Sequence, residues 1–150
     1  MDLTVKVKKL HPGAQLPRRA TSGSAAADLY ALCGDAGVLL RAQGGRAVLS
    51  TGIALELPSA EFVALIFARS GLGIKKGITL ANSVGVIDSD YRGELAVGLI
   101  NLSNEDYLVQ NGERIAQLAI LPVAAAQFVE VDALGDTLRG EGGLGSTGTR

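Results

Sequence analysis

Residues 78–101 read ITLANSVGVIDSDYRGELAVGLIN and contain the polar cluster around which the rest of the chain is organised. The turn-forming residues at 82–85 separate two β-prone apolar runs, so this stretch predicts a β-hairpin. Asp88 and Asp90 alternate with a serine, and on a strand both carboxylates would lie on one face. The alternative is a solvated turn in which aspartate is a local hydrogen-bond acceptor, and the stretch by itself favours that alternative.

The chain has 150 residues, of which 47% are hydrophobic, and this length suits one domain with a substantial core. None of its apolar runs reaches the roughly 20 residues of a membrane-spanning helix. The N-terminal residues MDLTVKVKKLH alternate apolar and polar side chains, which indicates a strand and not a signal peptide. We therefore expect no membrane association.

The charge and cysteine content narrow the function classes further. Fourteen basic and fifteen acidic residues give a net charge of -1, whereas a general nucleic-acid-binding protein would be strongly basic. The single cysteine, Cys33, excludes an internal disulfide framework and fits the reducing cytoplasm. We expect it to be a small core residue.

Most of the chain is predicted to form short strands. Together with 20 glycines, their short spacing indicates an all-β sandwich or barrel in a single domain. Residues 70–76 are predicted to form one short helix, with Ser70 near its start. The expected strands are 3–8, 25–32, 38–40, 48–57, 62–68, 95–100, 107–109, 115–122 and 124–131.

The C-terminal residues 136–150 differ in composition from the rest. Residues 139–148 read RGEGGLGSTG, with five glycines in ten positions, and such a segment buries little surface. One interpretation is a disordered tail. The other is a lid, because glycine lets backbone N–H groups approach a phosphate and Arg139 can pair with phosphate oxygens.

Two other polar features interrupt apolar runs. Arg69, Ser70 and Gly71 directly follow the strand expected at 62–68, an arrangement that suits an anion site or, alternatively, a helix cap with a surface arginine. Gln117 lies inside the apolar run GERIAQLAI at 112–120. A buried amide there would need hydrogen-bond partners, while the alternative is an exposed face of an edge strand.

Several chemistries are excluded by what the chain lacks. It has one histidine, His11, which argues against a histidine-based triad or a histidine-rich zinc site. Cys33 has no second cysteine with which to bind a metal. The remaining carboxylate, arginine, serine and glutamine side chains suit phosphate chemistry, in which a carboxylate activates water and cations neutralise charge.

Five stretches in order resemble the five motifs of the homotrimeric, all-β dUTPases. They are AADLYA at 26–31, ARSGLG at 68–73, NSVGVIDSDYRG at 82–93, GERIAQLAI at 112–120 and RGEGGLGSTG at 139–148. The resemblance implies a jelly-roll-like β fold with a short helix, formed by residues 1–135. It also implies a homotrimer with active sites shared between chains, and a flexible lid at 136–150 that closes over a site.

The same resemblance implies a dUTP diphosphatase. Such an enzyme hydrolyses dUTP to dUMP and pyrophosphate with Mg²⁺ on the triphosphate, which limits uracil in DNA and supplies dUMP for dTTP synthesis. Asp88 matches the family's catalytic, water-activating carboxylate. Tyr91 matches the aromatic residue that packs beneath the deoxyribose and leaves no room for a 2′-hydroxyl. Asp90 is expected to serve solvation or structure.

The remaining roles are also implied by motif position. The uracil-reading hairpin corresponds to Asn82 and the backbone of Gly85, Val86 and Ile87, and its polar mismatches with cytosine could be worth about 10⁴-fold or more. The phosphate ligands correspond to Arg69, Ser70, Gly71, Gln117, Arg139, Gly145 and Ser146. Asp28 matches the acid that holds Mg²⁺ through water, without direct ligation, and the alternative for it is a turn acceptor beside an apolar strand.

Leu144 departs from the family pattern, which commonly has an aromatic residue there. The aromatic ring stacks over the uracil in the closed state, and such stacking is worth roughly 1–3 kcal/mol in other contexts. Leucine covers the base but has no π face. We expect a functional enzyme whose lid closes more weakly or more dynamically.

Two other function classes remain as alternatives. A dCTP deaminase of the same fold would need a glutamate that acts at C4 of the base, and the hairpin region shows no acid that clearly does so. A non-catalytic nucleotide-sensing regulator would be expected to have lost Asp88 or Arg139, and both are present.

Overall fold

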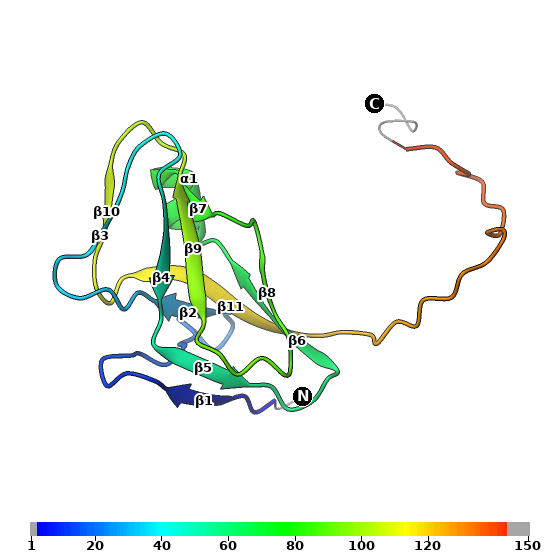
Figure 1. The fold of residues 1–150 in the computed structure, drawn as a ribbon, viewed down its shortest axis with the longest axis horizontal. Coiled ribbons are helices and arrows are strands. Elements are labelled where there is room, and N and C mark those ends of the chain that lie inside the picture. Colours follow the sequence, from blue (N-terminus) through cyan, green and yellow to red (C-terminus); the bar gives the residue numbers. More distant parts are fainter. Residues whose placement is uncertain (1–2, 144–150) are drawn as a thin grey trace.

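The computed structural model describes residues 3–143, which fold into short antiparallel strands and one helix (Figure 1). The strands and the helix are β1 (Lys6–Lys9), β2 (Ala27–Tyr30), β3 (Val38–Leu40), β4 (Arg46–Ser50), β5 (Ile53–Glu56), β6 (Phe62–Phe67), α1 (Ser70–Lys76), β7 (Ile78–Leu80), β8 (Gly85–Ile87), β9 (Ala96–Asn101), β10 (Tyr107–Val109) and β11 (Arg114–Pro122).

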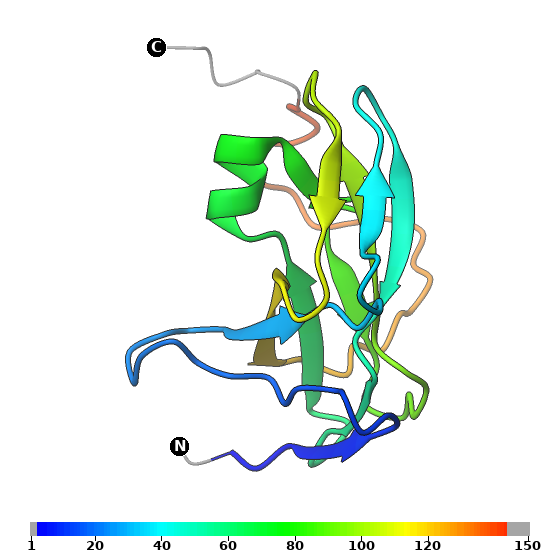
Figure 2. The same cartoon turned by 90° about the vertical axis from the view of Figure 1, so that its left-hand side faces the viewer.

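Two sheets carry most of the fold. One has the strand order β2-β11-β6-β8 and the other the order β4-β9-β7, while β1 pairs with β5 and β3 pairs with β10. Figure 2 shows α1 standing out from the sheets on the same side as the loop before β2. The expected all-β architecture with one short helix is confirmed.

The core lies between the strands and is built from aliphatic side chains that alternate with exposed positions. Leu49, Val97 and Leu99 are almost fully buried, as the period of two in β4 and β9 requires. Among the described residues, the buried polar side chains have hydrogen-bond partners. The amide of Asn101, for example, donates to the carbonyls of Leu40 at 3.0 Å and of Glu105 at 2.8 Å.

The strands and the helix fall close to their expected positions in most of the chain. The N-terminal strand begins only at Lys6. The single run expected at 48–57 is divided into β4 and β5 by Gly52, whose φ of 72° turns the chain between them. The helix ends where Gly77 adopts the left-handed conformation and its N–H donates to the carbonyl of Leu72.

The predicted hairpin at 78–87 is wrong as a pairing. β7 pairs with β9, whereas β8 pairs with β6, so the two strands belong to different sheets. The turn between them carries the chain across from one sheet to the other, with Ser83 at φ 65°. The turn residues were correctly located, but each flanking strand finds its hydrogen-bond partner elsewhere in the chain.

The strand predicted at 124–131 is also wrong in this structure. After Val123, whose N–H bonds the carbonyl of Glu61, residues 124–143 contain neither strand nor helix and extend away from the domain (Figure 1). Their apolar side chains are exposed, Phe128 by 95%. A strand needs a partner for its backbone groups, and this part of the chain has none beside it.

Among residues 3–143 the one helix is α1, and its seven residues are too few to cross a membrane.

Candidate functional site

A small pocket of about 230 Å³ opens where β8 ends. Its lining residues are Val86, Ile87, Asp88, Tyr91, Glu94 and Ala96. Asp88 is the first residue beyond β8 and its side chain is exposed to solvent. The structure therefore places the carboxylate proposed to activate water beside the aromatic ring proposed to contact the sugar.

Asp88 and Asp90 lie in a turn beyond the end of β8 and not on a strand, so of the two interpretations the structure agrees with the solvated turn that the stretch by itself favoured. The N–H of Tyr91 donates to the carbonyl of Asp88 at 3.2 Å, which closes the turn. Arg92 braces it, because its Nη1 donates to the carbonyls of Ser89 at 2.7 Å and Tyr91 at 3.1 Å. The alternative interpretation from the sequence, a solvated turn, describes this backbone.

Glu94 is a pocket residue that the sequence alone did not single out. Its carboxylate accepts the N–H of Gly52 at 2.7 Å, and its carbonyl accepts the hydroxyl of Tyr91 at 3.1 Å. The first bond ties the pocket to the corner between β4 and β5. An acidic residue following Arg-Gly was visible in the sequence, but its partner is 42 residues away.

The polar turn before β8 exposes the groups expected to read a base. Asn82 is exposed, and its carbonyl accepts the N–H of Val84 at 2.7 Å. Gly85 is buried against β6, where a Cβ would lie 3.1 Å from that of Ile66. Val86 is largely exposed and Ile87 half-buried. A narrow backbone edge is thus presented beside the pocket.

A second cluster forms around Asp28 on β2. Its Oδ1 accepts Nε of Arg69 at 2.9 Å, and its Oδ2 accepts Nη1 of Arg114 at 3.2 Å. The side chain of Asp28 is 6% exposed and that of Arg69 22% exposed. The suggestion that Asp28 is a turn acceptor is wrong. The sequence alone did not identify Arg114, because a single charged residue before the apolar run at 115–120 does not indicate a binding site.

Gln117 lies between these groups on the central strand β11. It is opposite Asp28 on β2 and opposite Phe67 on β6, and it is half-buried. The alternative of an exposed edge-strand glutamine is therefore wrong. The amide belongs to the same row of the sheet as the Asp28 carboxylate.

Arg69, Ser70 and Gly71 form the step from β6 into α1. Arg69 occupies the N-cap position without a side-chain cap bond, and its Nη1 donates to the carbonyl of Arg114 at 3.2 Å. Ser70 and Gly71 are exposed, and a Cβ on Gly71 would have open space around it. The helix-cap alternative accounts for the backbone of Arg69, whereas its side chain belongs to the Asp28 cluster.

A polar hollow of about 630 Å³ adjoins this cluster, and Asp28, Arg114 and Glu113 contribute to its lining. The carboxylate of Glu113 accepts the hydroxyl of Tyr107 and the N–H of Gln110. Burial and this carboxylate raise the pKa of Tyr107 to about 12. Burial, followed by the charge of Glu113, also raises the pKa of the Cys33 thiol, which packs against the core as expected.

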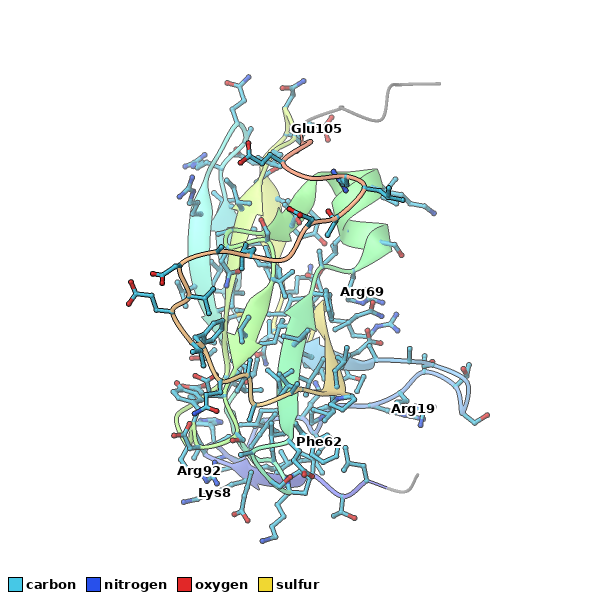
Figure 3. All side chains as sticks on the ribbon, turned by 90° about the vertical axis from the view of Figure 1, so that its right-hand side faces the viewer. Lys8, Arg19, Phe62, Arg69, Arg92 and Glu105 are labelled. Atoms are coloured by element: carbon cyan, nitrogen blue, oxygen red, sulfur yellow. The ribbon has the colours of Figure 1, made fainter. Side chains whose placement is uncertain are left out.

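The two clusters do not meet within one chain. β2 and β8 are the two edges of a four-stranded sheet, and Asp88 lies beyond the row that contains Asp28 and Gln117. Strand spacing and rise place Asp28 and Asp88 roughly 20 Å apart. Figure 3 shows Arg69 near the helix, whereas Arg92, the residue after Tyr91, lies at the other end of the domain near Lys8.

The tail residue Arg139 is exposed, and its Nε donates to the carbonyl of Gly142 at 2.7 Å. The predicted ligands Leu144, Gly145 and Ser146 lie outside the described residues. Residues 3–143 contain no group of three or more histidine, cysteine, aspartate or glutamate side chains that could hold a metal ion.

Comparison with known proteins gives one consistent answer. A family model described as dUTPase matches residues 13–148. A deoxyuridine 5′-triphosphate nucleotidohydrolase of Hydrogenobaculum is 50% identical over 144 residues, which cover 96% of this chain and 97% of that one. One of Anaplasma marginale is 47% identical over 149 residues, covering 98% and 99%.

A solved structure of the Staphylococcus bacteriophage 80alpha dUTPase with dUPNHPP has the same fold. It is 27% identical to this chain, with a TM-score of 0.86, and the match covers 97% of this chain and 98% of that one. Sequence and fold thus agree over nearly the whole length, and this chain belongs to the dUTPase family.

Proposed function

We propose that this protein is a dUTP diphosphatase that converts dUTP and water to dUMP and pyrophosphate. The observation that carries the proposal is the pocket in which the exposed carboxylate of Asp88 lies beside the ring of Tyr91. The carboxylate is open to water and the ring offers an apolar surface to a sugar. Membership of the dUTPase family identifies dUTP as the substrate.

In this mechanism Asp88 orients a water molecule and takes up its proton. The water oxygen forms a bond to the α-phosphorus as the bond from that phosphorus to the bridging oxygen breaks, and pyrophosphate leaves with the bonding electrons. A carboxylate that only has to aim and polarise water needs little more than correct position. The braced turn from Asp88 to Arg92 supports such a role.

Substrate selection is assigned to the pocket and to the turn before β8. Asn82 and the backbone of Gly85 to Ile87 read the uracil edge, and Gly85 lets that backbone lie against Ile66 without a side chain between them. The ring of Tyr91 closes the space that a 2′-hydroxyl would need.

The phosphates are assigned to the Asp28 cluster and to the tail. Asp28 holds the guanidinium of Arg69, while Ser70, Gly71 and Gln117 offer exposed or half-buried donors nearby. Residues 136–150 act as the lid of the domain formed by 1–135. Arg139 binds the γ-phosphate, and Gly145 and Ser146 add further donors.

Magnesium fits this arrangement as an ion that arrives with the triphosphate. The described residues offer it no dedicated cage, and Mg²⁺ is commonly bound through substrate phosphates and retained water. Each oxygen of Asp28 keeps a free acceptor site besides its arginine, so it can hold a magnesium-bound water. When bound, the ion neutralises phosphate charge.

In a homotrimer with shared sites, the Asp88 pocket of one chain would lie beside the Asp28 cluster of another chain. Since Asp88 and Asp28 lie roughly 20 Å apart within a chain, a triphosphate held by one cluster would reach the other cluster only on a second copy. The exposed apolar side chains of Phe128 and Leu134 also favour packing of the tail on another subunit. We place the enzyme in the cytoplasm, where its cysteine would remain reduced.

The test is product analysis with dUTP, dTTP, dCTP and UTP in the presence of Mg²⁺, for the wild type and for Asp88→Asn. We expect pyrophosphate from dUTP alone, and a fall in kcat of about 10²–10⁴-fold in the variant. Ammonia from dCTP would identify a deaminase instead. Tight nucleotide binding without turnover would identify a sensor and overturn the proposal.

A further inference from the structure

Gly93 lies two residues after Tyr91, and the tyrosine ring folds back over its α-carbon. A Cβ added to Gly93 would overlap the Tyr91 hydroxyl and would lie 2.5 Å from Cζ and 2.9 Å from Cε2 of the ring. Real Cβ atoms essentially never come within 3.0 Å of another atom in this way. The φ angle of Gly93 is outside the left-handed region, so its backbone would accept any side chain. The ring of Tyr91, and not the backbone conformation, is thus what a side chain at residue 93 would meet.

The surrounding bonds fix both ends of this contact. Arg92 holds the turn on one side through the carbonyls of Ser89 and Tyr91. Glu94 holds the other side through the N–H of Gly52, and its carbonyl accepts the Tyr91 hydroxyl at 3.1 Å. The position of the ring in the pocket thus depends on the bare α-carbon between two anchored residues.

We propose that Gly93 is a specificity-determining positioning residue that sets the depth of the Tyr91 ring beneath the sugar. The inference rests on the proposed function. The Tyr91 ring can reject a 2′-hydroxyl sterically only if it does not shift by about the size of one oxygen atom when the sugar binds. A methyl group on residue 93 would displace the Tyr91 ring and break the hydrogen bond from its hydroxyl to the carbonyl of Glu94. Tyr91 is 45% exposed, so its side chain can shift without unfolding the domain.

The experiment compares Gly93→Ala with the matched control Gly98→Ala. A Cβ on Gly98 meets only the Cβ of Ala81, at an ordinary 3.7 Å, so this control adds the same methyl group without displacing a ring. The readout is the ratio of kcat/KM for dUTP to kcat/KM for UTP, measured by pyrophosphate release with Mg²⁺. We expect Gly93→Ala to lower the ratio by a factor on the order of 10–100, and Gly98→Ala to preserve it.

A double-mutant cycle assigns the effect to the ring. In a Tyr91→Ala background, adding Gly93→Ala should leave the ratio unchanged, because the group on which it acts is gone. Thermal unfolding checks that each variant is folded, and a crystal structure of Gly93→Ala locates the ring. An unmoved ring, an unchanged ratio in the folded variant, or an equal effect without Tyr91 would each overturn the inference. If the wild-type protein released no pyrophosphate from dUTP, the proposed function itself would be wrong.

Discussion

Nε of Arg69 donates to Oδ1 of Asp28 at 2.9 Å, and this bond ties the end of β6 to β2, a strand that is not its neighbour in the sheet. The bond spans the central strand β11, on which Gln117 lies between the two. Arg114 occupies the second carboxylate oxygen of Asp28. One buried acid thus fixes two guanidinium groups, so its replacement should affect both stability and phosphate binding.

Asp28→Asn should lower the free energy of unfolding by about 3 kcal/mol, because it leaves Arg69 largely buried without a counter-charge. Urea unfolding measures this change, and the KM for dUTP should rise as the arginines lose their positions. Glu56→Gln is the control, since it breaks the exposed pair with Lys6 and should barely move the unfolding midpoint. Equal losses in the two variants would contradict this account of Asp28.

Arg139→Ala should weaken dUTP hydrolysis without weakening the fold. The side chain is exposed, and its bond to Gly142 is local to the tail, so the thermal midpoint should not change. A lost charge-assisted bond to phosphate corresponds to a fall in kcat/KM of about ten- to a hundredfold. Glu141→Gln, a change two residues away, should keep full activity. Loss of stability in Arg139→Ala would show that the tail belongs to the folded core.

Tyr107 makes stability depend on pH at the alkaline end. Its pKa is about 12 in the folded protein against 10.0 for the free side chain, so the unfolded chain loses this proton first as pH rises. The stability that Tyr107 contributes is fully present below pH 10 and should be lost between pH 10 and 12.

The measurement is the difference in unfolding free energy between the wild type and Tyr107→Phe across this range. At pH 7 the variant should be less stable by about 1–2 kcal/mol, because Glu113 loses a hydrogen bond. The difference should shrink above pH 10, and other alkaline titrations cancel in the comparison. A difference that stays constant to pH 12 would show that the pKa of Tyr107 is not raised.

Leu144→Phe should tighten the closed state, a prediction that rests on the family resemblance because Leu144 lies outside the described residues. A ring over the uracil should raise kcat/KM for dUTP by about tenfold, at the low end of measured stacking energies. Leu138→Phe is the control, since that exposed leucine precedes the motif. If the KM and turnover of Leu144→Phe match those of the wild type, the interpretation of this departure is wrong.

The order and spacing of the strands could be predicted from local pattern in most of the domain. Residues 107–109 and 70–76 were placed to the residue, because β10 is bounded by polar residues and α1 ends at Gly77. Residues 124–131 show the limit of this reasoning. Phe128, Val129 and Val131 are β-prone, but β-propensity leads to a strand only beside a partner, and residues 3–143 place no strand partner there.

The sequence by itself determined the kinds of structure and chemistry: short strands, one helix, a glycine-rich tail, and the acid, arginine and aromatic residues of five motifs. These are local properties, set by side-chain alternation, turn residues and motif order. The tertiary structure alone decided that β7 and β8 join different sheets and that Asp28 holds both Arg69 and Arg114. It also decided that the Tyr91 ring lies against Gly93 and that Asp88 follows β8, at the opposite edge of the sheet from Asp28 on β2. Pairing and contact depend on which distant segments pack together, and that choice is made by the whole chain at once.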